Sequence, residues 1–238
     1  AYIQSLNLAP KSNIALLGRN SAHWIMADLA IWMAGHVTVP LYPTLNGETA
    51  EYIFEHSDAK LLIVGKMDGK ADGWKEIKDV IPKEMPIIAA PLSPPEIKNQ
   101  PQWDDIVAKT EPLKNPALPQ LDDIATIVYT SGSTGKPKGV LHSFRTMIVI
   151  TSGMEEIWGF SSNERMLSYL PLAHVAERAA VETMSLYFGF HVFFSEVRVF
   201  WIALENLPGN PREFWRDLFA IVDTIFHSIV EDRLHRSE

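Results

Sequence analysis

Short apolar runs alternate with amphipathic stretches over most of the chain. The runs predict strands at residues 13–18, 37–42, 60–65, 86–90, 124–130, 166–170 and 190–195. The stretches between them predict helices at residues 22–34, 48–56, 72–81, 140–158 and 172–188. Strands that alternate with helices in this way form parallel sheets covered on both faces. The predicted fold class is therefore α/β, with mostly parallel sheets and helices on both faces.

Two segments depart from this pattern. Residues 91–120 are rich in proline and predict an extended connection, held to the body by a short amphipathic piece at residues 103–107. After residue 196, apolar side chains recur every three or four positions, at Phe214, Trp215, Leu218, Phe219, Val222, Ile225, Phe226 and Ile229. This spacing predicts one helix face that packs on the core or on a partner. We therefore divide the chain into a domain, 1–196, and a helical tail, 197–238.

Composition narrows the classes of function. The net charge of −8 argues against a nucleic-acid-binding protein, whose affinity rests on a basic surface. The chain has no cysteine, which excludes disulfides and thiolate metal sites and fits a reducing compartment. No apolar run is long enough to span a bilayer, so we expect a cytoplasmic protein. Because the chain begins with Ala1 on what resembles the end of a helix, we expect it to be a fragment.

The strongest chemical signal is the segment Thr130–Gly139, Thr-Ser-Gly-Ser-Thr-Gly-Lys-Pro-Lys-Gly, which follows the buried run at residues 124–128. Glycine lets successive backbone N–H groups approach an anion, and hydroxyl side chains add further donors. Lys136 and Lys138 supply positive charge for phosphate. This combination predicts a loop that holds the polyphosphate of a nucleotide.

The loop differs from two well-known phosphate loops. In the Walker A pattern a glycine stands five residues before the glycine of the Gly-Lys pair, and here that position is Thr130. Pro137 replaces the Ser or Thr that follows the lysine, and proline disfavours a helix that starts under the phosphates. The dinucleotide pattern Gly-x-Gly-x-x-Gly is also absent.

The whole of Thr130–Gly139 instead resembles the phosphate-binding signature of the adenylate-forming (AMP-binding) superfamily, which includes acyl-CoA synthetases, luciferases and adenylation domains. Residues 169–178, Tyr-Leu-Pro-Leu-Ala-His-Val-Ala-Glu-Arg, resemble the next motif of that superfamily in the form found in long-chain fatty-acid-CoA ligases. The segments at residues 18–24 and 35–43 are similar to the same branch. The resemblance covers most of residues 1–196, and it implies the incomplete N-terminal part of an adenylate-forming domain.

The resemblance implies a reaction and a set of site residues. ATP and a long-chain fatty acid would form an acyl-adenylate, with Mg²⁺ as the metal, and coenzyme A would then give the thioester; a fatty-acyl substrate implies peripheral contact with a membrane. The nucleotide would be bound by Thr130, Ser131, Gly132, Ser133, Thr134, Gly135, Lys136 and Lys138, with Lys136 and Thr134 as the catalytic residues. His174 would lie beside the acyl pocket. Glu177 and Arg178 are interpreted as an ion pair or as helix contacts, and His142 is a weaker candidate to face the nucleotide. No metal ligand is assigned.

Three hypotheses remain open at this point. The chain is the N-terminal part of a long-chain fatty-acid-CoA ligase, a non-catalytic nucleotide- or acyl-binding remnant, or a member of another adenylating branch such as the aryl-CoA ligases. The later motifs and the small C-terminal domain of the superfamily are missing from residues 197–238. The tail is either divergent or the product of a truncated or shifted reading frame. We therefore expect this chain alone to bind nucleotide weakly and not to complete the ligase reaction.

Overall fold

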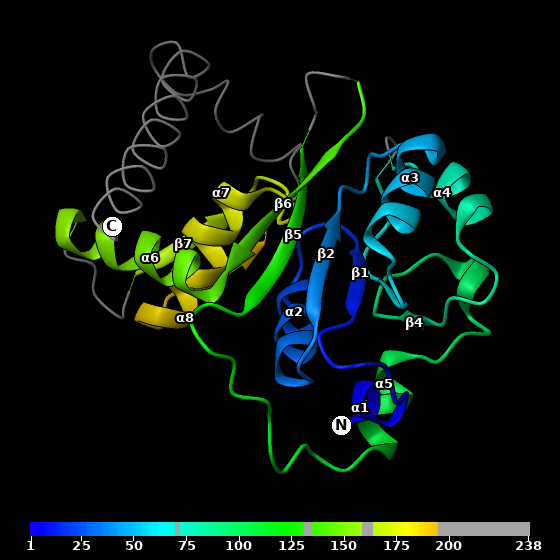
Figure 1. Cartoon of the computed structure of the whole chain (residues 1–238), viewed down its shortest axis with the longest axis horizontal. Helices are drawn as coiled ribbons and strands as arrows, with labels where there is room; N and C mark the ends of the chain where they lie inside the picture. Colours follow the sequence, from blue (N-terminus) through cyan, green and yellow to red (C-terminus); the bar gives the residue numbers. More distant parts are fainter. Residues whose placement is uncertain (70–71, 131–134, 159–163, 195–238) are drawn as a thin grey trace. The chain divides into compact units, whose positions relative to one another are not determined.

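The computed structural model describes residues 1–69, 72–130, 135–158 and 164–194, without the side chains of residues 154–158 (Figure 1). The chain forms two compact units. Unit 1 comprises Ala1–Phe144 and Pro171–Ala173, and unit 2 comprises Arg145–Leu170 and His174–Glu238. The two units are described separately below.

Unit 1 is built on a six-stranded sheet of order β4-β3-β1-β2-β5-β6. The strands are β1 (Asn13–Leu17), β2 (Val37–Leu41), β3 (Leu61–Val64), β4 (Ile87–Ala89), β5 (Ile124–Thr130) and β6 (Lys138–Ser143). Every neighbouring pair is parallel except β5 and β6, which are antiparallel. The prediction of an α/β fold with a mostly parallel sheet is confirmed.

Three helices of unit 1, α2 (Ala22–Met33), α3 (Gly47–Ser57) and α4 (Trp74–Val80), begin and end within two residues of the predicted ones. Helix α5 (Trp103–Lys109) covers the predicted amphipathic piece. The structure adds α1 (Tyr2–Ser5) and the short 3₁₀ helix η1 (Pro95–Ile97), which lies in the segment expected to be extended. The Ser21 hydroxyl accepts the N–H of Trp24 at 3.2 Å and so caps α2. Gly35, directly after the C-cap of α2, has φ +86°, a left-handed conformation that glycine adopts at no steric cost.

The core of unit 1 explains why its strands read as continuous apolar runs. All residues of β2 and β3 are buried, because helices cover the sheet on both faces. Ala15 and Leu17 of β1 pack in one cluster with Ile53 and Phe54 of α3 and with the buried residues of α4. Since side chains alternate along a strand, Ile14 and Leu16 point to the other face, where α2 contacts β1 and β2.

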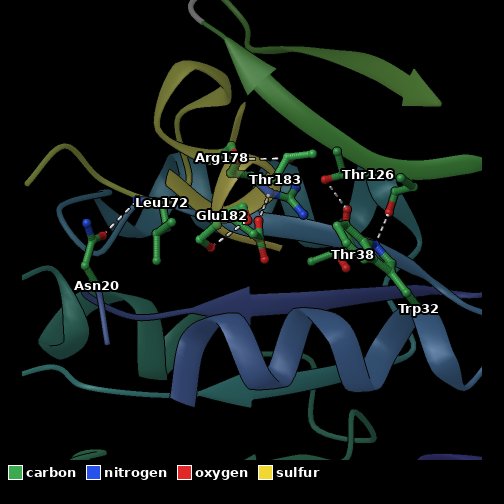
Figure 2. A network of polar contacts seen from close by, with 10 residues as sticks. Asn20, Trp32, Thr38, Thr126, Leu172, Arg178, Glu182 and Thr183 are labelled. Atoms are coloured by element: carbon green, nitrogen blue, oxygen red, sulfur yellow. Dashed lines mark hydrogen bonds and ion pairs between the residues drawn. The ribbon is translucent and has the colours of Figure 1, made fainter. Parts of the chain in front are cut away.

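Two side-chain bonds hold β5 in place beside β2. The indole N–H of Trp32 on α2 donates to the carbonyl of Ala125 at 2.9 Å. The buried Thr126 hydroxyl donates to the carbonyl of Thr38 on β2 at 2.8 Å, and Figure 2 shows both bonds. The strand that leads into residues 131–134 is thus fixed by α2 and by its neighbour in the sheet.

The segment after residue 137 corrects one prediction. Residues 140–143 were expected to begin a helix, but they belong to β6, and helix α6 begins only at Phe144 (Phe144–Trp158). Val140 and Leu141 are consecutive apolar residues, so their spacing does not distinguish a strand from a helix. The pairing of β6 with β5 along Thr130↔Lys138 to Ile124↔Ser143 decides the outcome.

Unit 2 has a small core of its own. Two parallel strands, β7 (Arg165–Ser168) and β8 (His191–Phe194), flank a helical stretch made of α7 (Val175–Glu177), the π-helical turn η2 (Arg178–Thr183) and α8 (Met184–Phe188). Ile150, Ala179, Met184 and Phe190 form its buried cluster. The helix was expected to start at Leu172; it starts at Val175, because His174 is its N-cap.

The tail at residues 197–238 lies outside the described residues, so its predicted helix stays a prediction. Over the part of the chain that the structure describes, we find no helix with the length and apolar character needed to cross a membrane.

Candidate functional site

The predicted phosphate loop is the connection of a β-hairpin in unit 1. Strand β5 ends at Thr130 and β6 begins at Lys138, and these two residues form the last pair of the ladder. Both ends of the loop are therefore held by strands of one sheet. Of the predicted nucleotide-binding residues, Ser131, Gly132, Ser133 and Thr134 lie outside the described residues, and their assignment stays a prediction.

The other predicted nucleotide-binding residues are exposed. Thr130, Gly135, Lys136 and Lys138 all present their surface to solvent. Gly135 has φ +88°, and a Cβ added there would meet nothing within 4 Å. The backbone conformation, and not a lack of space, therefore favours glycine at this position. The hairpin end thus offers a hydroxyl, a backbone segment and two ammonium groups to a ligand in solvent.

Gly139 has a different role from Gly135. It pairs with Tyr129 across the hairpin. A Cβ at Gly139 would lie 2.9 Å from Cγ2 of Ile127 and 3.3 Å from Cζ of Tyr129. Only glycine therefore lets the Tyr129 ring lie across the hairpin without displacement of these side chains. The motif glycine serves packing here, which residue type and spacing alone did not indicate.

Sequence reasoning missed the aromatic residues that approach the loop from α3. Nδ1 of His56 lies 2.7 Å from the Tyr129 hydroxyl oxygen, and the ring of Tyr52 stacks on that of His56. Burial raises the pKa of Tyr129 to about 12, so its hydroxyl stays protonated and can donate to a neutral His56. The Lys136 ammonium lies 5.4 Å from the centroid of the Tyr52 ring. The only signal in the sequence was that Tyr52 and His56 are four residues apart on a predicted helix.

The second predicted motif, residues 169–178, is divided between the two units. In unit 1, the backbone N–H of the buried Leu172 donates to Oδ1 of Asn20 at 2.8 Å, as Figure 2 shows. In unit 2, the exposed His174 accepts the N–H of Ala176 on its Nδ1 at 3.1 Å. This bond requires an unprotonated Nδ1 and favours the tautomer with the proton on Nε2. The proposed position of His174 beside an acyl pocket stays a prediction.

Glu177 and Arg178 have different partners. The buried Glu177 accepts the Ser168 hydroxyl at 2.8 Å and the N–H of Tyr169 at 2.9 Å. Arg178 bonds to Glu182 at 3.0 Å, with both side chains almost fully buried (Figure 2). Burial raises the pKa of Glu177 to about 7, against the opposing effect of these hydrogen bonds. These side chains hold the strand end and helix of unit 2 together, which agrees with the interpretation as helix contacts.

The exposed end of the hairpin carries groups that can bind an anion. Exposed ammonium, hydroxyl and backbone groups can stabilise negative charge on phosphate oxygens. Within the described residues we find no group of three or more His, Asp or Glu side chains that could hold a metal ion. We derive no step through Mg²⁺. His142, a weaker candidate, is buried on β6.

Comparison with known proteins identifies the family. The sequence model of the family described as "AMP-binding enzyme" matches residues 1–236. The chain belongs to this family. The resemblance of residues 1–196 to adenylate-forming enzymes is thereby confirmed, and the match also extends into the tail.

The curated relatives include fatty-acid enzymes. The chain is 28% identical over 228 residues to the Arabidopsis thaliana protein "Long chain acyl-CoA synthetase 6, peroxisomal", a match that covers 92% of the chain and 30% of the relative. It is 33% identical over 200 residues to "Fatty acyl-CoA synthetase A" of Dictyostelium discoideum, with 80% of the chain and 30% of the relative covered. The chain thus spans less than a third of the length of these relatives.

A solved structure confirms the fold. The anthranilate CoA ligase AuaEII in complex with anthranoyl-AMP superposes with a TM-score of 0.71, over 85% of this chain and 39% of that one. The sequence identity is 22%, so this likeness concerns the fold alone. This result agrees with the expectation that the chain has the fold of part of an adenylate-forming domain.

Proposed function

We propose that this chain supplies the phosphate-binding loop of an ATP-dependent acid-thiol ligase that activates a long-chain fatty acid. The single observation that carries the proposal is the exposed cationic end of the β5–β6 hairpin, where Lys136 and Lys138 flank Pro137 in unit 1. The relatives named as long-chain and fatty acyl-CoA synthetases support the choice of acid.

The proposed role of the loop follows from the negative charge that develops in the first step of the reaction. In the first step, a carboxylate oxygen of the fatty acid attacks the α-phosphorus of ATP, and the bond to pyrophosphate breaks. Negative charge then grows on the leaving pyrophosphate, and we propose that Lys136 and the hydroxyl of Thr130 stabilise it. Thr134 is proposed to add a second hydroxyl. No covalent nucleophile is required of the protein in this step.

In the second step, the thiol of coenzyme A attacks the acyl carbon of the adenylate, and AMP leaves. We propose that the longer protein completes this step, since this chain spans about 30% of each relative.

The decisive experiment is ATP–pyrophosphate exchange with a panel of acids, measured on a full-length enzyme that contains this segment. Exchange that depends on palmitate supports the proposal. Exchange that depends only on an aromatic acid such as anthranilate assigns the enzyme to the aryl-CoA branch instead. Absence of exchange with every acid leaves a non-catalytic nucleotide- or acyl-binding protein. The 238-residue chain, assayed beside it, is expected to show no exchange.

A further inference from the structure

Lys136 contacts a residue that lies far from it in the sequence. Lys136 is exposed, and a lysine on an exposed loop has many rotamers of similar energy. In this structure its Nζ lies 5.4 Å from the centroid of the Tyr52 ring, within the range of a cation–π contact. Tyr52 belongs to α3, which is neither part of the motif nor adjacent to it in the chain.

Tyr52 is itself held in place by a series of ring contacts. His56, one turn further along α3, stacks on Tyr52 with centroids 5.3 Å apart and an interplanar angle of 27°. The rings of His56 and Tyr129 form a T-shaped pair, with centroids 5.7 Å apart and an interplanar angle of 86°, and Nδ1 of His56 lies 2.7 Å from the Tyr129 hydroxyl oxygen. Tyr129 is 6% exposed and directly precedes Thr130 at the start of the loop.

Both ends of this series rest on rigid parts of unit 1. The neighbouring α3 residues Ile53 and Phe54 are each only 2% exposed and belong to the main core, so the helix has little freedom to move. At the other end, Tyr129 lies in β5 and packs over Gly139 of β6. The aromatic series therefore connects the core-facing helix to both strands of the hairpin and places one ring under the end of Lys136.

A ring in this position leaves the lysine able to bind phosphate. The ammonium carries three N–H donors, and contact with the face of one ring does not use all of them. The ring attracts the cation and reduces the number of positions that the ammonium samples. Binding a phosphate oxygen then costs less side-chain entropy, because part of the ordering is already present.

We propose that Tyr52 is a positioning residue for the loop, and that its ring, braced by His56 and Tyr129, holds the Lys136 ammonium where the nucleotide phosphates bind. This inference rests on the proposed function of Lys136. It adds a residue outside the motif, and it gives the aromatic pair at positions 52 and 56 a role beyond packing.

The first test measures the contact itself, without a nucleotide. In NMR spectra of the 238-residue chain, the Lys136 ε-methylene protons should be shifted upfield by the ring current of Tyr52, with Lys136→Ala used to assign them. Tyr52→Phe keeps a ring and should preserve the shift, whereas Tyr52→Leu should abolish it. If the Lys136 resonances are the same in wild type and Tyr52→Leu, the proposal is overturned.

The second test measures ATP binding by the same chain and its variants. Tyr52→Leu should weaken binding about two- to fivefold, the size expected of a cation–π contact at a solvent-exposed site, and Tyr52→Phe should stay close to wild type. In the Lys136→Ala background, Tyr52→Leu should have no further effect, because the side chain that it positions is gone. Tyr2→Leu, on α1 of the same unit, is the matched control and should bind as wild type does.

The outcomes separate this inference from the proposed function. If Lys136→Ala weakens ATP binding and Tyr52→Leu does not, the positioning role is wrong and the function of the loop stands. If Lys136→Ala binds ATP as wild type does, the assignment of the loop and the role of Tyr52 both fail. An equal loss in Tyr52→Phe and Tyr52→Leu would also overturn the proposal, since the ring would not be the cause.

Discussion

Two polar segments of unit 1 follow buried parallel strands, and they differ in what their side chains contact. The first, Arg19-Asn20-Ser21, comes after β1. The second begins at Thr130 and ends at Lys138, between β5 and β6. Both segments contain hydroxyl and basic residues, and both follow strands of the same parallel sheet, where ligand-binding residues are often found. Residue type and position in the fold therefore do not distinguish them.

The contacts do distinguish them. In the first segment, Arg19 bonds to Asp72, Asn20 accepts the N–H of Leu172, and Ser21 caps α2. In the second, Thr130, Lys136 and Lys138 are exposed, and Lys136 contacts an aromatic ring. The polar groups of the first segment form hydrogen bonds and an ion pair within the fold, whereas those of the second are exposed to solvent, where a ligand can bind.

The largest expected effect concerns the second segment. Lys136→Ala in a full-length enzyme should lower the rate of ATP–pyrophosphate exchange by about 100-fold or more, because charge on the leaving pyrophosphate loses an ammonium partner. The free energy of unfolding should change by less than about 0.5 kcal/mol, since the side chain is exposed. An unchanged exchange rate would refute the assignment of Lys136.

Glu177 of unit 2 is a buried polar residue of a sequence motif, and we expect it to affect the stability of the fold. Its pKa is raised to about 7 from the usual 4.5, mainly by burial, so the folded state binds the proton more tightly than the unfolded state. The contribution of the protonated group to stability is complete below about pH 4.5 and is lost as the pH rises through about 7.

Wild-type stability should therefore fall by about 2 to 3 kcal/mol between about pH 5 and about pH 8, relative to Glu177→Gln, as measured by chemical denaturation. Glutamine keeps an oxygen that can accept the Ser168 hydroxyl and the N–H of Tyr169. Parallel pH profiles of the two proteins would contradict this account of Glu177.

Asp72→Ala is the counterpart of Lys136→Ala in the first segment. The side chain of Asp72 is 3% exposed and accepts Nη2 of Arg19 at 2.6 Å, Nε of Arg19 at 2.9 Å and the N–H of Gly69 at 2.8 Å. Asp72→Ala removes the acceptor of these three bonds, so the free energy of unfolding should fall by about 2 kcal/mol.

Arg19→Lys is the matched control and should have an intermediate effect, because lysine keeps the charge but not the planar geometry of guanidinium. ATP binding measured on folded protein should be unchanged in both variants. A loss of binding without a loss of stability would mean that this segment also contacts the ligand, and the contrast between the two segments would fail.

The smallest expected effect belongs to the cap of α2. Ser21→Ala removes the acceptor for the N–H of Trp24 and should lower the free energy of unfolding by about 1 kcal/mol. Ser21→Asp restores an acceptor and should recover most of that loss. Thermal unfolding of the three proteins under one condition provides the measurement, and equal melting temperatures would show that the cap contributes nothing.

Much of unit 1 could be predicted because its signals are local. The buried runs and the helix predicted at residues 22–34 each depend on residues within a few positions of one another, and the structure confirms them. The order of the strands, the antiparallel β6 and the start of α7 at Val175 depend on pairing and capping that local periodicity does not contain. Val140 and Leu141 illustrate the limit, since two adjacent apolar residues fit either a strand or a helix.

The candidate site shows the same division. By itself, the sequence determined the family and the phosphate-binding character of Thr130–Gly139, because these depend on consecutive residues of particular chemistry. Only the tertiary structure decided that Thr130 and Lys138 close a hairpin and that Tyr52 lies beside Lys136. The physical reason is that these contacts join segments far apart in the chain, and the packing of α3 on the sheet brings them together.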